Sequence, residues 1–279
     1  MRGDMIRPEE VIDFHVHCFP ESLAKRAVDS VPFASGHKLS GTLKGQLDFM
    51  ERTGMKGCAL LHMASRPDTQ RNVNMFARST MGPGRFVFGS VHPAAEDAAG
   101  QVHWLYDQGI RGIKFHTGHQ DFDFDDPAWV PLYREIGRLG MAVLVHCGAT
   151  AKSSRHLVWP HTVARVIDAF AGAPVICAHM GGASPGQEAF SLLCSLPVYV
   201  DTALTPRMMD AKTLAQAVEG LGCGRVLFGS DLPWADFSQT LNLVQEAASH
   251  APYLDWDAVA WKNAEHLAQC LGVQINWLR

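Results

Sequence analysis

Eight short apolar runs recur along the chain. They lie at residues 11–16, 58–63, 85–91, 109–115, 141–146, 173–179, 196–201 and 225–231. Most of them are nearly continuous in hydrophobic residues rather than alternating, which is typical of strands that are buried on both faces of a parallel sheet. The pattern therefore predicts eight buried strands.

Segments with helical spacing separate these runs. The apolar positions that recur every three or four residues are Leu43, Leu47 and Met50; Leu132, Ile136 and Leu139; Val163, Val166, Ile167 and Phe170; and Leu241, Val244 and Ala248. Strand and helix thus alternate along 279 residues, which predicts an α/β fold, a single (β/α)8 TIM barrel domain spanning residues 1–279. The alternative is an open doubly wound sheet, but neither GxGxxG nor GxxxxGK[ST] occurs in the chain.

Composition narrows the class of protein. The chain is 47% hydrophobic and 19% charged, with a net charge of −4 and no basic block, so we expect a small-molecule enzyme rather than a nucleic-acid binder. No apolar run approaches the roughly 20 residues of a membrane helix, and "MRGDMIRPEE" lacks the apolar core of a signal peptide, so we expect no membrane partner and a cytoplasmic location. Seven scattered cysteines without a CxxC pair favour reduced thiols.

Polar residues follow the predicted strands at their carboxyl ends. They are His15, His17, Lys114, His116, His146, His179 and Asp231, with His62, His92 and Asp201 near the ends of the three remaining strands. In a (β/α)8 barrel these ends meet on the face where active sites are built. Imidazole nitrogens together with a carboxylate suit Zn²⁺, Mn²⁺ or Fe²⁺, so the pattern predicts a divalent metal site there. Gly181, Gly182 and Gly229 flank two of these residues, where the backbone must turn sharply or approach a neighbour closely.

Five segments in order resemble the amidohydrolase superfamily. They are "DFHVH", "RGIKFH", "VLVHCG", "CAHMGG" and "LFGSDLPW", and "WKNAEHLAQCLG" follows as a terminal helix. Within the superfamily, the chain is similar to the amidohydrolase-2 branch, which includes aminocarboxymuconate semialdehyde decarboxylase and related lactonases. Members of this branch often pair, so a homodimer is a candidate oligomeric state.

The resemblance implies a role for each strand-end residue. His15, His17, His146 and Asp231 would bind one metal ion, most simply Zn²⁺, with Mn²⁺ and Fe²⁺ as alternatives. His179 would contact the metal or its bound water and, with Asp231, act as a catalytic proton-transfer group. Asp13 would orient a histidine or a loop. In other branches a carbamylated lysine bridges two metals, and a binuclear site at Lys114 is the less favoured alternative.

The substrate is less well defined than the metal site. Lys114 and His116 are predicted to bind an anionic group, with Arg66 and Arg207 as further cations and Trp234 as a wall of the pocket. Exposed, uninvolved arginines are the ordinary alternative for Arg66 and Arg207. The first prediction is a metal-dependent hydrolase that cleaves an ester, lactone or amide bond of a small carboxylate-bearing substrate. The alternative is a non-oxidative decarboxylase of an unsaturated or aromatic acid, and a remote alternative is a catalytically inert metal-binding barrel.

Overall fold

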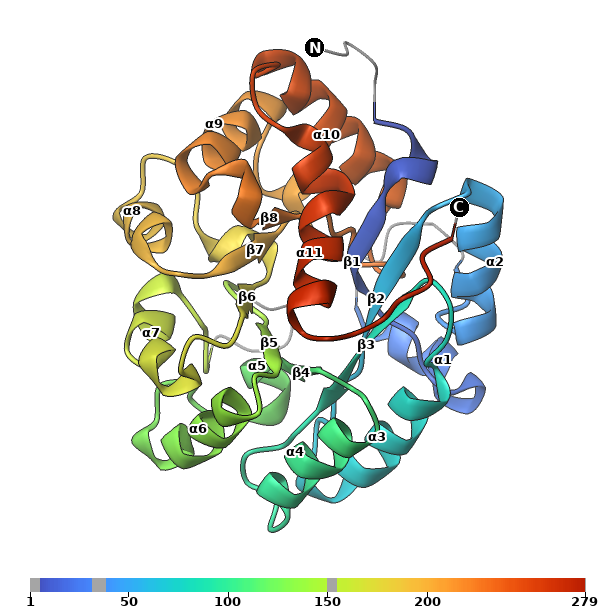
Figure 1. Cartoon of the computed structure of the whole chain (residues 1–279), viewed down its shortest axis with the longest axis vertical. Coiled ribbons are helices and arrows are strands. Elements are labelled where there is room, and N and C mark those ends of the chain that lie inside the picture. Colours follow the sequence, from blue (N-terminus) through green and yellow to red (C-terminus); the bar gives the residue numbers. More distant parts are fainter. Residues whose placement is uncertain (1–5, 32–38, 150–154, 279) are drawn as a thin grey trace.

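Eight parallel strands form one sheet in which each strand pairs with the next along the chain (Figure 1). The computed structural model describes residues 6–31, 39–149 and 155–278. The strands are β1 (Ile12–Val16), β2 (Gly57–Leu61), β3 (Arg85–Ser90), β4 (Gly112–Phe115), β5 (Ala142–Val145), β6 (Val175–Cys177), β7 (Tyr199–Asp201) and β8 (Val226–Leu227). All eight predicted strands are confirmed, although several are shorter than the apolar runs.

The sheet closes into a barrel along a seam between β1 and the segment that follows β8. The Phe14 amide donates to the Phe228 carbonyl at 2.7 Å, and the Asp231 amide donates to the His15 carbonyl at 2.9 Å. The His17 amide then donates to the Leu232 carbonyl at 2.7 Å. The (β/α)8 barrel prediction is therefore confirmed, and the seam brings the first and last strands together.

Helices surround the strands (Figure 1). They are α1 (Glu21–Asp29), α2 (Leu43–Thr53), α3 (Gln70–Ser79), α4 (Ala98–Asp107), α5 (Thr117–Gln120), α6 (Val130–Arg138), α7 (Pro160–Ala164), α8 (Glu188–Ser195), α9 (Ala211–Leu221), α10 (Phe237–His250) and α11 (Asn263–Cys270). The spacing from Val163 to Phe170 does not form one helix: it is split between α7 and a 3-10 turn at Ile167–Phe170, because Val166 leaves the helical region at φ −126°. None of the helices in the described residues is long and apolar enough to cross a membrane.

The amino ends of the strands are closed by the C-terminal part of the chain. Leu267 of α11 and Leu271, which follows this helix, join the apolar cluster inside the barrel. Residues 273–278, which we call the C-terminal strap, then pass the starts of β2 and β3. The Gly84 amide donates to the Asn276 carbonyl at 2.8 Å, and the Leu278 amide donates to the Lys56 carbonyl at 2.8 Å. The opposite end, at the carboxyl ends of the strands, carries the polar residues singled out in the sequence.

Candidate metal centre

His15, His17 and Asp231 converge where β1 meets the segment after β8. The Nε2 atoms of His15 and His17 each lie 3.3 Å from Asp231 Oδ1. All three residues are buried, and one potential ligand atom from each lies within 4.8 Å of the others. The two histidines share one side of β1 because they are two residues apart on a strand. The structure therefore brings together three of the predicted metal ligands.

The second ring nitrogen of each histidine fixes its tautomer. His15 Nδ1 lies 2.7 Å from Asp201 Oδ2, and His17 Nδ1 lies 3.0 Å from the Leu61 carbonyl oxygen. Both partners are acceptors, so each Nδ1 carries the proton and each Nε2 presents a lone pair. Burial lowers the pKa of His15 to about 4 and also lowers the pKa of His17. Neutral imidazoles beside a carboxylate are a donor set that suits Zn²⁺, Mn²⁺ and Fe²⁺, so these residues fit the predicted ion.

Asp201 was not among the predicted site residues, although it ends the run "LPVYVD" of β7. Its Oδ1 accepts from the backbone amide of His179 at 2.8 Å, while its Oδ2 accepts from His15. Burial alone would raise the pKa of Asp201, but the contacts with His15 and His179 outweigh it and lower the pKa. Asp201 is therefore an ionised positioning residue that links β1 to β6. Its place at a strand tip was the signal that could have identified it.

Asp13 performs the positioning role that was expected of it. Its Oδ1 accepts from the His15 amide at 3.1 Å and from the Ser230 amide at 2.9 Å, and its Oδ2 accepts from the Ser230 hydroxyl. Burial raises the pKa of Asp13 to about 7 even though the hydrogen bonds from Ser230 oppose the shift. One carboxyl group thus fixes both β1 and the turn that carries Asp231.

The backbone is unusual at two of the polar residues. His179 has φ 57° and Asp231 has φ 75°, which is the left-handed region that side chains other than glycine rarely adopt. Such conformations are found at functional sites because the surrounding contacts hold them in place. Gly181 also has a positive φ, 65°. Gly229 instead allows a close approach, since a Cβ atom there would lie 2.9 Å from the His15 Cβ.

His146 and His179 lie beside this group. His179 Nε2 is 3.0 Å from His146 Nδ1, and His179 Nδ1 is 3.1 Å from the Ala203 carbonyl. His179 also forms a potential ligand group with His15 and Asp201. His146 belongs to neither group, but its Nε2 is buried without a hydrogen-bond partner among the described residues. A ligand role for His146 or His179 stays a prediction.

Lys114 adds a buried cation next to the histidines. Its side chain is 1% exposed, and Nζ has no hydrogen-bond partner in the described part of the chain. Burial lowers the pKa of Lys114 to about 8, although Asp201 and Asp231 pull it upward. His116 follows it on the chain and stacks on His146 with ring centroids 4.0 Å apart. Burial of an unpaired ammonium group costs free energy unless an anion binds to it.

One cavity has a volume of about 750 Å³. It is lined by all the residues predicted to bind substrate, namely Lys114, His116, Trp234, Arg66 and Arg207. Much of its wall is apolar, including Phe19, Leu23, Phe76 and Leu204. The Trp234 ring lies 4.7 Å from the His17 ring, as expected for a pocket wall. Arg66 is exposed and paired with Asp68 at 3.0 Å, so its guanidinium already has a carboxylate partner. Contact of any of these residues with a substrate stays a prediction.

Solved structures share this fold at low sequence identity. An uncharacterised TIM-barrel protein from Bordetella bronchiseptica is 20% identical with a TM-score of 0.74, covering 94% of this chain and 99% of that one. A dihydroxybenzoic acid decarboxylase from a Polaromonas species, solved with manganese and 2-nitroresorcinol, is 15% identical with a TM-score of 0.69 (93% and 96%). A candidate 2-pyrone-4,6-dicarboxylic acid hydrolase from Pseudomonas putida is 20% identical with a TM-score of 0.66 (93% and 97%). A search of curated proteins finds no match.

One protein-family model matches most of the sequence. The model described as Amidohydrolase, of the amidohydrolase-2 type, matches residues 12–267. This range runs from the first residue of β1 into α11 and includes every residue of the buried His and Asp group. The predicted family is thereby confirmed: the chain belongs to the amidohydrolase family, in its amidohydrolase-2 branch.

Proposed function

We propose that the protein is a metal-dependent decarboxylase that releases CO₂ from a small aromatic or unsaturated carboxylic acid. The observation that carries this proposal is Lys114, a buried ammonium group without a partner in the described residues, at a largely apolar cavity. An anionic substrate would supply the missing partner, while the apolar walls suit a flat carbon skeleton. The manganese-containing decarboxylase among the similar structures supports the same reaction class.

The residues divide the work between holding the substrate and moving a proton. His15, His17 and Asp231 would hold the metal, which would bind and polarise a substrate oxygen. Lys114 would hold a second oxygen of the substrate. The bond between the carboxyl carbon and its neighbour breaks, CO₂ leaves, and the electron pair stays on the neighbouring carbon. That carbon then takes up one proton, which His179 or Asp231, both beside His15, would deliver.

Hydrolysis remains the second candidate. The sequence alone favoured it, and one similar structure is a candidate 2-pyrone-4,6-dicarboxylic acid hydrolase, at 20% identity. The same buried histidines and Asp231 would then serve to activate water instead of protonating carbon. The other reported structures of stated activity support decarboxylation, including a 5-carboxyvanillate decarboxylase from Sphingomonas paucimobilis at 16% identity. We therefore rank decarboxylation first.

The metal is proposed to be a single divalent ion. Both groups of potential metal ligands include His15, which supports one centre at the carboxyl end of β1. Zn²⁺ and Mn²⁺ both suit imidazole and carboxylate donors. Metal content measured on purified protein, with and without added bicarbonate, tests this directly. One equivalent per chain is expected, and two equivalents with bicarbonate would contradict the proposal.

Reactions in D₂O distinguish the two chemistries. Protein loaded with Mn²⁺ or Zn²⁺ would be given dihydroxybenzoates, 5-carboxyvanillate, 2-pyrone-4,6-dicarboxylate and simple lactones. Decarboxylation releases CO₂ and leaves one deuterium on the product carbon, and both are seen by mass spectrometry. Hydrolysis opens an ester or lactone without loss of CO₂. Ring opening of the lactones, including 2-pyrone-4,6-dicarboxylate, without release of CO₂ from any acid would refute decarboxylation and establish the second candidate.

A further inference from the structure

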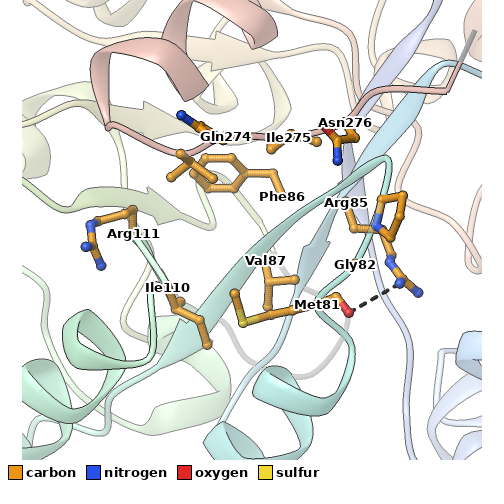
Figure 2. Close-up of a pocket in the computed structure, with 13 residues that line it drawn as sticks. Met81, Gly82, Arg85, Phe86, Val87, Ile110, Arg111, Gln274, Ile275 and Asn276 are labelled. Carbon is orange, nitrogen blue, oxygen red and sulfur yellow. Dashed lines mark hydrogen bonds between the residues drawn. The ribbon is translucent and has the colours of Figure 1, made fainter.

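A second pocket lies at the opposite end of the barrel, beside the C-terminal strap. Its volume is about 270 Å³, just below the roughly 300–1,000 Å³ that is usual for small-molecule sites. Figure 2 shows Gln274 and Asn276 of the strap along one edge, with Val87 and Ile110 across from them. Nothing in the proposed reaction uses this pocket, because the metal centre is at the carboxyl ends of the strands and this pocket is at their amino ends.

Arg85, the first residue of β3, lines this pocket and is a cation with an unused donor. Its Nη2 donates to the Met81 carbonyl at 3.3 Å (Figure 2). Its Nε is buried and has no hydrogen-bond partner in the described residues. Leaving a buried donor unpaired costs about 1–3 kcal/mol, and a carboxylate oxygen is the acceptor that a guanidinium group binds best. Gly82 makes room for this arrangement, since a Cβ atom there would lie 1.6 Å from Arg85 Nη2.

Arg111 supplies a second positive charge on another side of the pocket. Its guanidinium lies 3.9 Å from the centre of the Tyr106 ring, and its Nη1 donates to the Tyr106 carbonyl at 2.5 Å. No Asp or Glu lines the pocket, and within the described ranges neither arginine forms an ion pair. The pocket therefore combines two cations with no carboxylate in its lining.

The rest of the lining is apolar or uncharged. Phe86, Val87 and Ile110 are buried and form an apolar wall, while Gln274 and Asn276 are exposed on the strap and leave the pocket open to solvent. A ligand that pairs with the arginines and also covers the apolar wall has an anionic head and a small apolar body. We infer that this pocket binds a small monocarboxylic acid, with Arg85 contacting the carboxylate and Phe86, Val87 and Ile110 contacting the body.

Benzoate, titrated into the full-length metal-loaded protein carrying [methyl-¹³C]methionine, tests this inference. Met81 lines this pocket and Met63 lines the catalytic cavity, so the two methyl signals, each assigned by a Met→Leu variant, report the two sites separately. We expect a saturable shift of the Met81 signal with benzoate and none with benzamide, which has no charge. A shift of Met63 alone would overturn the inference without bearing on decarboxylation, which is read by CO₂ release.

Variants sharpen the same titration. Arg85→Gln is expected to raise the dissociation constant read at Met81 at least tenfold, whereas Arg138→Gln, at an exposed arginine paired with Glu135, leaves it unchanged. Gly82→Ala keeps the charge of Arg85 but displaces its guanidinium, so it should weaken binding even if Arg85→Gln fails to fold. Equal affinity in Gly82→Ala and the parent protein would refute the role of Arg85. Inorganic phosphate that binds as well as benzoate would refute the carboxylic acid class, because it makes no use of the apolar wall.

Discussion

The two ends of the barrel are built from the same eight strands but differ in how far their buried polar groups have hydrogen-bond partners. At the carboxyl ends, Lys114 Nζ, His116 Nδ1 and His146 Nε2 are buried without partners among the described residues, and Asp231 has a left-handed backbone. At the amino ends, the strand interior packs on apolar residues of α11, and the C-terminal strap pairs its backbone with Lys56 and Gly84. Unsatisfied groups are unfavourable for folding, so the carboxyl ends are arranged for ligands. The amino ends are packed for stability except at the pocket of Arg85, whose Nε also has no hydrogen-bond partner among the described residues.

Two glycines show the contrast on a small scale. A Cβ atom at Gly229 would meet the His15 Cβ at 2.9 Å, which is a contact within the metal centre. A Cβ atom at Gly57 would meet the Trp277 ring at 2.3 Å and the Gly84 carbonyl oxygen at 2.8 Å, which are contacts with the strap and its neighbour. Replacement of glycine by alanine should therefore affect metal binding at Gly229 and the stability of the fold at Gly57.

The largest effect is expected for Asp231→Asn. This substitution removes a proposed metal ligand and proton-transfer group, so kcat/KM should fall by about 10²–10⁴-fold or more. The melting temperature of the metal-free protein should change little by comparison. Asp48→Asn is the matched control, because Asp48 is a partly exposed residue paired with Lys44 on α2, away from the metal centre. Comparable activity of Asp231→Asn and Asp48→Asn would remove Asp231 from the reaction.

Gly229→Ala should weaken metal binding without removing any ligand. The added methyl group displaces His15, and disturbance of a group that orients a ligand typically costs about 10–100-fold in metal affinity. Competition with a chromophoric chelator measures the change. Gly224→Ala serves as the control, since no atom lies within 4 Å of a Cβ atom at that position. If both variants bind metal like the parent protein, the contact between Gly229 and His15 has no bearing on the site.

The binding of an anionic substrate should weaken as pH rises through about 8. Burial lowers the pKa of Lys114 from 10.5 to about 8, so the ammonium form is lost above that pH and KM should rise by up to about tenfold per pH unit. Because the folded protein binds this proton less tightly than the unfolded chain, the free energy of unfolding of the metal-free protein should rise between about pH 8 and 10.5. Lys114→Met should abolish this dependence of KM, and Lys44→Met should retain it.

The smallest effect on activity is expected for Gly57→Ala. Overpacking against Trp277 and the Gly84 carbonyl should lower the free energy of unfolding by about 1–3 kcal/mol in urea denaturation. Metal affinity and kcat should stay at the parent values, because the strap lies away from the metal centre. A loss of kcat in Gly57→Ala without a loss of stability would show that a change at the amino ends of the strands affects catalysis at their carboxyl ends.

Hydrophobic pattern was sufficient to predict the barrel and its strand order. All eight runs contain strands, because nearly continuous apolar segments are typical of strands that are covered on both faces in a parallel sheet. The strand ends were less predictable: in the run ending at Asp231 only Val226–Leu227 is strand, because the following residues turn to carry the carboxylate. The break after α7 also escaped the pattern, since apolar spacing does not report the backbone angle of Val166.

The site was predictable where strand tips carry metal-binding residues. His15, His17 and Asp231 meet as expected, because closure of the barrel forces the two ends of the sheet together. Asp201 was missed as a partner of His15, since a single aspartate at a strand end has many ordinary explanations. The choice between hydrolysis and decarboxylation lay beyond the sequence, because one His and Asp group supports both reactions and the cavity walls decide which substrate enters.

The seam between β1 and β8 has a consequence for how the protein reaches its native state. Its hydrogen bonds join Phe14 to Phe228 and His17 to Leu232, so residues more than two hundred positions apart must meet before the barrel is closed. Contacts of such long sequence separation form slowly. His17 and Asp231 come together only across this seam. A metal ion that needs both ligands would therefore bind only after the barrel has closed. The rate of metal binding during refolding would then report the rate of barrel closure.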